Sequence, residues 1–186
     1  MKKLTLWEMI YAFGMAVACA ISYLLTTELL GGLIDRSDTL LGGMWATVAT
    51  VFVFRETREG SLSAGISRLI ATCVSFVLCF IYIELFRVNA VGIGLVIGVG
   101  TIVMMLLGRR EDIVTTGITT TVVLVAAAID PGHALAQPPL RLLDTIVGVA
   151  VGVLFKLVAS HAVARIGVVP ASNEPAGSAT EKRAST

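Results

Sequence analysis

Long apolar runs separated by short polar breaks make up most of this chain. They lie at about residues 6–34, 39–54, 66–86, 88–108, 113–129 and 140–164. Each run is near or above the roughly 17–25 residues that cross a bilayer as a helix. The runs are continuous, which excludes the alternating pattern of a membrane β-barrel. Because lipid offers no partner to backbone N–H and C=O groups, the pattern predicts an all-α polytopic membrane protein with six transmembrane helices.

The composition agrees with this prediction. Of the 186 residues, 56% are hydrophobic and 15% are charged, and the mean hydropathy is +0.89. Soluble domains contain roughly 45–50% apolar residues. We expect a six-helix transmembrane domain over residues 1–165 and a disordered cytoplasmic tail over residues 166–186, which are rich in Pro, Ser and Ala. Lys2 and Lys3 precede an apolar run as in a signal peptide, but the run continues to Ile34, which favours an uncleaved first span.

The basic residues predict the orientation in the membrane. Six spans place both chain ends on one side, which carries eleven Lys and Arg residues against three on the other. The eleven are Lys2, Lys3, Arg55, Arg58, Arg68, Arg109, Arg110, Lys156, Arg165, Lys182 and Arg183, and the three are Arg36, Arg87 and Arg141. Because Lys and Arg accumulate on the cytoplasmic side, both termini are expected there, with the protein in a cell membrane and a bacterial inner membrane favoured. The net charge of +1 does not indicate a nucleic-acid partner.

Residues that carry enzyme or metal chemistry are sparse. Cys19, Cys73 and Cys79 lie inside predicted spans without the spacing of zinc ligands or of a disulfide framework. His133 and His161 fall on opposite predicted sides of the membrane. The stretches "GSLSAG" and "GIGLVIGVG" lack the context of a nucleophile elbow or a phosphate loop. We therefore expect no enzyme activity, no metal site and no cofactor.

Two pairs of glycines have the spacing of close helix contacts. Gly94 and Gly98 are four residues apart, and Gly148 and Gly152 repeat this spacing. Small residues four apart allow two helix backbones to approach closely. The contacts are expected within the chain or across a homo-oligomer such as a dimer, and packing within the chain is favoured.

A short internal repeat relates the two halves of the chain. "RLIATCVS" starts at Arg68 in the third run, and "RLLDTIVG" starts at Arg141 in the sixth, 73 residues later. Three spans per half turn the second copy upside down relative to the first, which predicts a 3+3 inverted repeat. In transporters built this way the substrate site lies at the interface between the repeats.

These residues resemble a known family. Trp45-Ala46-Thr47, with the segments that start at Arg68 and Arg141, resembles the fusaric acid resistance and aromatic acid exporter proteins, which are distantly similar to plant aluminium-activated malate transporters. Ala71 and Ser75 stand where the family's Arg-x-x-Gly-Thr-x-x-Gly helix start often has glycine, and Asp144 takes the first of these places in the second copy. The resemblance implies transport of organic anions such as aromatic carboxylates through a dimeric helical bundle, with the lipid bilayer as its surroundings.

The candidate substrate-binding residues follow from the repeat. They are Arg68, Thr72, Arg141, Asp144, Thr145 and Trp45. An arginine within a span should face water, a partner or an anion. Arg68 could alternatively extend to lipid phosphate, as long basic side chains do at membrane interfaces.

The second arginine has an internal partner within reach. Arg141 and Asp144 are spaced to pair on one helix, and a structural ion pair is favoured there over a free anion site. Trp45 could stack on an aromatic substrate, but packing within the bundle is favoured. Three function classes are compared: an organic-anion transporter or channel working as an exporter, a non-transporting membrane scaffold or subunit of a larger export assembly, and an intramembrane enzyme. The enzyme is the least favoured of the three.

Overall fold

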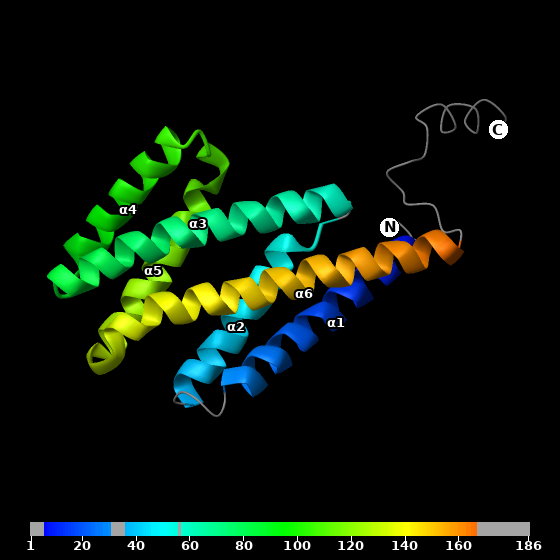
Figure 1. Cartoon of the computed structure of the whole chain (residues 1–186), viewed down its shortest axis with the longest axis horizontal. Coiled ribbons are helices and arrows are strands. Elements are labelled where there is room, and N and C mark those ends of the chain that lie inside the picture. The colour runs from blue at the N-terminus through cyan, green and yellow to red at the C-terminus, as the bar shows by residue number, and fades with distance from the viewer. Residues whose placement is uncertain (1–5, 31–35, 56, 167–186) are drawn as a thin grey trace, which may run out of the picture.

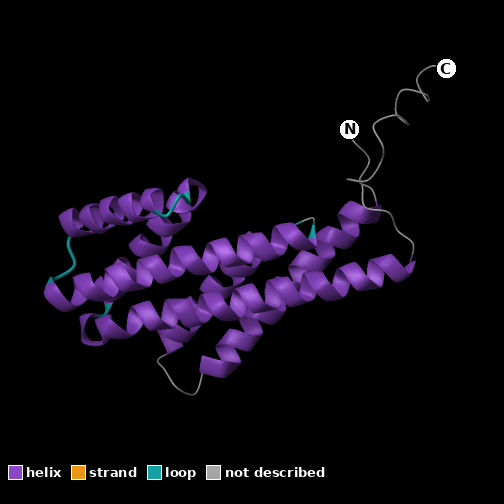
Figure 2. Ribbon diagram, turned by 45° about the horizontal axis from the view of Figure 1, so that its top comes forward, coloured by secondary structure: helices purple, strands orange, loops and turns teal. Residues whose placement is uncertain are grey.

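The computed structural model of the chain describes residues 6–30, 36–55 and 57–166. Within these ranges the chain forms helices joined by short connections and no strand, as Figure 1 and Figure 2 show. The α-helices of the described ranges are α1 (Leu6–Leu30), α2 (Arg36–Val53), α3 (Arg58–Leu85), α4 (Ala90–Leu106), α5 (Ile113–Ile129) and α6 (Gln137–Ile166). Short 3-10 helices, η1 (Arg110–Asp112) and η2 (Pro131–Ala136), precede α5 and α6. The expected tail lies outside the described residues.

The third helix begins earlier than the hydrophobic pattern predicts. The apolar run suggests a start near Ile66, but α3 starts at Arg58. Thr57 is extended and its side chain accepts a hydrogen bond from the Gly60 N–H, at 3.1 Å. An N-cap of this kind satisfies one of the free N–H groups of the first turn, so the helix can extend through polar residues. Arg68 therefore lies ten residues into the helix, about 15 Å along its axis.

Most of the helices have the character of membrane spans. Four helices of the described part are long and apolar enough to cross a membrane, and they cover Glu8–Glu28, Arg58–Leu85, Arg110–Ile129 and Pro131–His161. Two shorter apolar helices cover Asp38–Val53 and Ala90–Leu106. Many large apolar side chains point outward, so the chain is a membrane protein whose outer surface suits lipid. Six complete spans remain a prediction.

Two long helices run through the middle of the bundle. α3 and α6 lie side by side and point in opposite directions (Figure 1). α1 and α2 pack against α6, and α4 and α5 pack against α3. α1 begins and α6 ends at the end of the bundle where α2 leads into α3 (Figure 1). We call this the inner end, because the basic residues predict it to be cytoplasmic, and we call the opposite one the outer end.

The helix pairs α3–α5 and α6–α2 pack in the same register. Ser75 Oγ on α3 donates to the Thr116 carbonyl on α5, at 3.1 Å. On the other side, Gly148 of α6 lies directly against the carbonyl of Ala46 on α2. Gly148 comes 73 residues after Ser75, and Ala46 comes 70 residues before Thr116.

One helical turn further along, a second pair of contacts shows the same correspondence between the two halves. Cys79 Sγ lies 3.9 Å from the Thr120 carbonyl, and the backbone of Gly152 lies against the Thr50 carbonyl. These positions have the same offsets of 73 and 70 residues. The two contact lines, which we call the α3–α5 seam and the α2–α6 seam, therefore use corresponding residues of the two halves.

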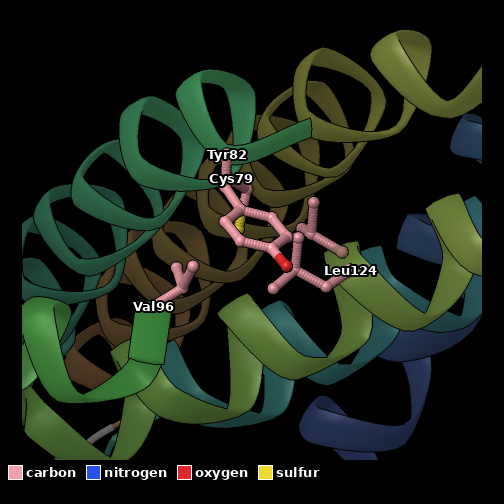
Figure 3. Close-up of a cluster of buried hydrophobic side chains, with 5 residues drawn as sticks. Cys79, Tyr82, Val96 and Leu124 are labelled. Carbon is pink, nitrogen blue, oxygen red and sulfur yellow. The ribbon is translucent and has the colours of Figure 1, made fainter. Parts of the chain in front are cut away.

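A hydrophobic cluster fills the outer part of the α3, α4 and α5 group. Figure 3 shows Cys79 and Tyr82 of α3 packed with Val96 of α4 and Leu124 of α5. Gly92 allows α4 to approach, because a side chain at this position would overlap the Tyr82 ring. This cluster anchors α4 to α3 and α5.

The two predicted glycine pairs have different surroundings. Gly148 and Gly152 lie in the α2–α6 seam, within the chain. A side chain added at Gly94 or Gly98 would meet no atom of the described residues within 4 Å. These two glycines therefore face outward, and the favoured prediction of a contact within the chain is wrong for them.

Candidate functional site

The Arg141 and Asp144 side chains form a buried ion pair at the outer end. Arg141 Nη1 donates to Asp144 Oδ2 at 2.8 Å, and the side chains are 1% and 0% exposed. Gly42 on α2 packs against the carboxylate, since a Cβ there would lie 2.8 Å from Asp144 Oδ1. The favoured prediction of a pair on α6 therefore agrees with the geometry, and the pair is buried between α6 and α2.

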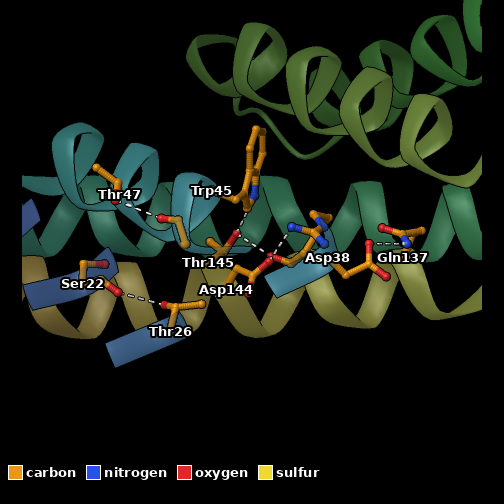
Figure 4. Close-up of polar contacts among 10 residues, drawn as sticks. Ser22, Thr26, Asp38, Trp45, Thr47, Gln137, Asp144 and Thr145 are labelled. Atoms are coloured by element: carbon orange, nitrogen blue, oxygen red, sulfur yellow. Dashed lines mark hydrogen bonds and ion pairs between the residues drawn. The ribbon is translucent and has the colours of Figure 1, made fainter. Parts of the chain in front are cut away.

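Two further polar side chains extend this pair toward the start of α6. Gln137 Nε2 donates to Asp38 Oδ1 at 3.1 Å, which joins α6 to α2 (Figure 4). Asp38 is half-buried, whereas Gln137 is buried. Asp38, Gln137, Arg141 and Asp144 are called the outer polar cluster below. It holds two carboxylates and one guanidinium, so its formal charge is negative when both acids are ionised.

The guanidinium of Arg68 has different surroundings. The residue is 2% exposed, and none of its three guanidinium nitrogens has a hydrogen-bond partner in the described part of the chain. Its Cζ lies 5.1 Å from the centre of the Trp45 ring and 4.8 Å from the centre of the Phe52 ring. These distances are within the range of cation–π contacts. The position against two rings of α2 does not fit the alternative of a side chain extended to lipid phosphate.

Arg68 lies in the wall of a cavity at the inner end. The cavity has a volume of about 540 Å³ and lies between the first turns of α3, the last residues of α2 and the start of α5. Its lining residues are Phe52, Arg55, Gly60, Ser63, Ala64, Ser67, Arg68, Glu111, Asp112, Val114 and Thr115. We call it the inner cavity.

Asp112, which directly precedes α5, forms an ion pair with Arg109. Arg109 Nε donates to Asp112 Oδ2 at 2.7 Å, and Arg109 also donates to Ser67 Oγ. Asp112 is 6% exposed, so this ion pair is partly shielded from water. Asp112 is thus paired with Arg109, and the described residues form no ion pair with Arg68, although Glu111 lines the same cavity.

Trp45 connects the two arginines. Its ring lies under Arg68, and its Nε1 donates to Thr145 Oγ1 at 3.2 Å. Thr145 Oγ1 in turn donates to the Arg141 carbonyl at 2.8 Å. Figure 4 shows Trp45, Thr145 and Asp144 together on this side of α6. Trp45 is 3% exposed, so its position agrees with the favoured prediction of packing and also links the two sites.

The two threonines of the repeat have the same local role. Thr72 Oγ1 donates to the Arg68 carbonyl at 2.8 Å, as Thr145 does to the Arg141 carbonyl. A hydroxyl that bonds to the carbonyl one turn earlier satisfies its own donor within the helix. Thr72 and Thr145 therefore keep only acceptor capacity for other groups.

Several contacts are not predicted from the sequence. Phe52 joins Trp45 around Arg68, and its spacing of seven residues from Trp45 is the only signal, since both lie on one helix face. Lys156 lies over the rings of Tyr11 and Phe54, at 5.2 and 5.5 Å. Asp38 and Gln137 are 99 residues apart, and nothing local pairs them.

The described residues contain no group of three His, Cys, Asp or Glu side chains that could hold a metal ion. Around Arg68 the described side chains offer cationic, aromatic and hydroxyl groups for binding. The unpartnered guanidinium of Arg68 beside a cavity is suited to an anion.

Comparison with known proteins identifies the family. Neither the curated proteins nor the solved structures gave a match. A sequence model of proteins described as fusaric acid resistance protein-like matches residues 17–155, which is well over half of the chain. The matched region contains both repeated segments, the outer polar cluster and the inner cavity. It confirms the resemblance noted from Trp45 and the two arginine segments: the chain belongs to the fusaric acid resistance protein-like family.

Proposed function

We propose that this protein moves organic anions across the membrane, and that carboxylates bearing an aromatic ring are its substrate class. The proposal is carried by the buried guanidinium of Arg68, which has no polar partner among the described residues and borders the inner cavity. Membership of the family supports a transporter-type role. No redox or covalent chemistry is needed for this function.

The energetics of Arg68 favour an anionic ligand. Placing an arginine at the centre of a membrane helix costs roughly 2.5–3.5 kcal/mol by insertion scales, and here no carboxylate offsets the cost. A bound carboxylate would supply the missing charge, and the planar guanidinium matches its two oxygens. Trp45 and Phe52 place aromatic rings beside the guanidinium, which favours a ligand that carries its own ring.

We propose export as the direction. The inner cavity opens at the end that the basic residues predict to be cytoplasmic, so a substrate would enter from the cytoplasm. Reporter fusions after Arg110 should then report the cytoplasm, and fusions near His133 the exterior. An exterior signal after Arg110 would reverse the direction.

We also propose that the two halves form a 3+3 inverted repeat. The support is the common register of the α3–α5 and α2–α6 seams, in which Ser75 and Gly148 meet the carbonyls of corresponding residues on α5 and α2. In such folds the substrate path follows the interface between the repeats. Arg68 and Arg141 lie on the helices that form this interface, α3 and α6.

The test is flux of benzoate and of a panel of ring-bearing and dicarboxylic acids into proteoliposomes. Arg68→Glu should reduce benzoate flux most, Arg68→Gln by about tenfold or more, and Arg68→Lys least, because only the last keeps the charge; a tenfold change corresponds to about 1.4 kcal/mol. Arg58→Gln is the matched control, since Arg58 lies on the same helix and is exposed, but is not among the residues that line the cavity. Wild-type flux from folded Arg68→Glu protein would exclude Arg68 from the path.

A scaffold remains the second candidate, because α4 offers an uncovered surface. Gly94 and Gly98 face outward beside Val91 and Leu95, which are 81% and 60% exposed. We propose that this face contacts a second copy of the chain, since small residues allow close approach of helices in lipid. Gly94→Leu should then reduce crosslinked dimer. A scaffold without transport would need this face and tolerate Arg68→Gln.

A further inference from the structure

The repeated arginines differ in the residue three positions further along the helix. After Arg141 this residue is Asp144, whose carboxylate is paired with the guanidinium. After Arg68 it is Ala71, which is fully buried and has no polar group to offer. If both arginines lie on one anion path, a substrate can reach Arg68 directly. At Arg141 it has to compete with a carboxylate that belongs to the protein.

The Asp144 carboxylate accepts fewer hydrogen bonds than its two oxygens could. Its Oδ2 receives one hydrogen bond from Arg141, whereas its Oδ1 has no partner in the described part of the chain and Gly42 lies against it. Arg141 in turn leaves Nε and Nη2 without partners. A buried charge pair repays its desolvation only when the remaining donors and acceptors are satisfied. This pair is therefore held by a single charge-assisted hydrogen bond.

The charged groups around Asp144 come from three helices. Arg141 lies on the same helix, and Asp38 of α2 adds a second carboxylate that interacts with both members of the pair. On α3 the charged group on this side is Arg68, which lies over the Trp45 ring. α1 presents the hydroxyls of Ser22 and Thr26 (Figure 4). The outer polar cluster thus holds two acids and one guanidinium, and neutralising one acid balances its formal charge.

We propose that the carboxyl group of Asp144 is a proton-binding site that releases Arg141 to a substrate carboxylate; this inference rests on the transport function proposed above. A proton from the outer solution adds to a carboxylate oxygen of Asp144, whose charge changes from −1 to 0. The charge–charge attraction to Arg141 is then lost, and the guanidinium binds the carboxylate of the anion. When the proton leaves, Asp144 regains its charge and displaces the anion. Asp38 of the same cluster is half-buried, so the outer polar cluster is partly open to solvent.

The first experiment measures benzoate flux in proteoliposomes while the pH is varied only on the side that contains η2. Wild-type flux should rise as this pH falls, by up to about tenfold per pH unit, the limit for one titrating group. Asp144→Asn should remove this dependence, because an amide does not titrate. His133→Gln and Asp130→Asn are the controls: both residues are ionisable groups near the outer end but lie outside the cluster, so these variants should keep the wild-type pH profile.

The second experiment detects the proton without transport. Infrared difference spectra recorded on adding benzoate should show a protonated carboxylic acid band in the wild type that is absent from Asp144→Asn. If Asp144→Asn does not fold, Arg141→Gln/Asp144→Asn removes both charges together and should fold. Its flux should be low and independent of the outer pH.

The outcomes separate the two proposals. Absence of benzoate flux at every pH, together with no effect of Arg68→Gln on binding, would overturn the transport function itself. Flux that depends on Arg68 but has the same pH profile in wild type and Asp144→Asn would overturn only the proton site. A carboxylic acid band that persists in Asp144→Asn would also overturn it.

Discussion

Arg68 and Arg141 begin two similar sequence segments, yet one guanidinium lacks a polar partner among the described residues and the other forms an ion pair with Asp144. The neighbouring seams explain part of the difference. Gly148 and Gly152 bring the backbone of α2 directly against α6. In the α3–α5 seam Ser75 and Cys79 place a hydroxyl and a thiol between the helices.

The consequence is a difference in available space. Where glycine closes the α2–α6 seam, Gly42 also packs on Asp144, and the Arg141 guanidinium is paired with this carboxylate. Where side chains separate α3 from α5, the inner cavity lies between their first turns. A buried arginine in this fold can therefore be structural or available for binding, and the packing of the adjacent helix decides which.

The largest expected difference is in stability. Arg141→Gln leaves Asp144 buried without its cation, which should lower the free energy of unfolding by about 3–5 kcal/mol. Arg68→Gln removes a charge that has no hydrogen-bond partner among the described residues and loses only the contacts with two rings, so the free energy of unfolding should change much less. Thermal unfolding in detergent measures both, with Arg55→Gln as the reference. Equal losses at the two arginines would show that Arg68 also has a structural partner.

The second largest difference in stability is expected between the two glycine pairs. Gly148→Leu forces a side chain into the Ala46 carbonyl and should cost about 1–3 kcal/mol or more of unfolding free energy. Gly94→Leu meets open space in the described part and should leave monomer stability unchanged. Unfolding of the two variants in the same detergent makes the comparison. A destabilised Gly94→Leu monomer would contradict an outward-facing α4 surface.

Breaking the hydrogen bond between Trp45 and Thr145 should lower the free energy of unfolding by a smaller amount. Trp45→Phe keeps a ring beneath Arg68 but loses the hydrogen bond to Thr145, at a cost of about 0.5–1.5 kcal/mol. Thr145→Val removes the same hydrogen bond from the other side. In a double-mutant cycle the second substitution should cost less once the first is present. Fully additive losses would mean that the bond contributes nothing.

The smallest effect is expected at the exposed ion pair of η2, where His133 Nδ1 lies 2.8 Å from Asp130 Oδ2. The hydrogen bond with His133 holds the pKa of Asp130 below its ordinary value. A lowered folded-state pKa means that the stabilisation is present above the ordinary pKa of aspartate and is lost as the pH falls through the lowered value. Asp130→Asn should remove this acid-side loss, which is small because water screens the pair. Unfolding curves against pH test it, and an unchanged acid limb would contradict a stabilising pair.

Local patterns predicted much of this fold, and tertiary contacts supplied the rest. The apolar runs predicted the helices, and the "RLIATCVS" and "RLLDTIVG" segments predicted which residues correspond. The apolar run does not reveal the start of α3, because Arg58 and Glu59 are charged and Gly60 disfavours helix, although Thr57 is a recognisable cap. Asp38 was missed because its partner Gln137 is 99 residues away.

The glycines illustrate the same limit. The four-residue spacing of Gly94 and Gly98 is identical to that of Gly148 and Gly152, yet only the second pair is covered by another helix of the described chain. On α4 the glycines that contact the bundle are Gly92 and Gly100, which face Tyr82 and the side chains of Leu78 and Thr116. Spacing identifies a face that can be approached, and the position of the neighbouring helices determines whether it is.

The charges of the bundle are arranged unequally along its axis, and this has an electrical consequence. Arg68 gives the inner half a buried positive charge that forms no ion pair with the described residues, whereas the outer polar cluster holds two acids and one base. Fixed charge of one sign raises the local concentration of the opposite ion. Anions are thus enriched near the inner mouth and depleted near the outer one. In a voltage clamp with equal benzoate on both sides, anion current through the protein should rectify, and Arg68→Gln should make its current–voltage relation more nearly linear.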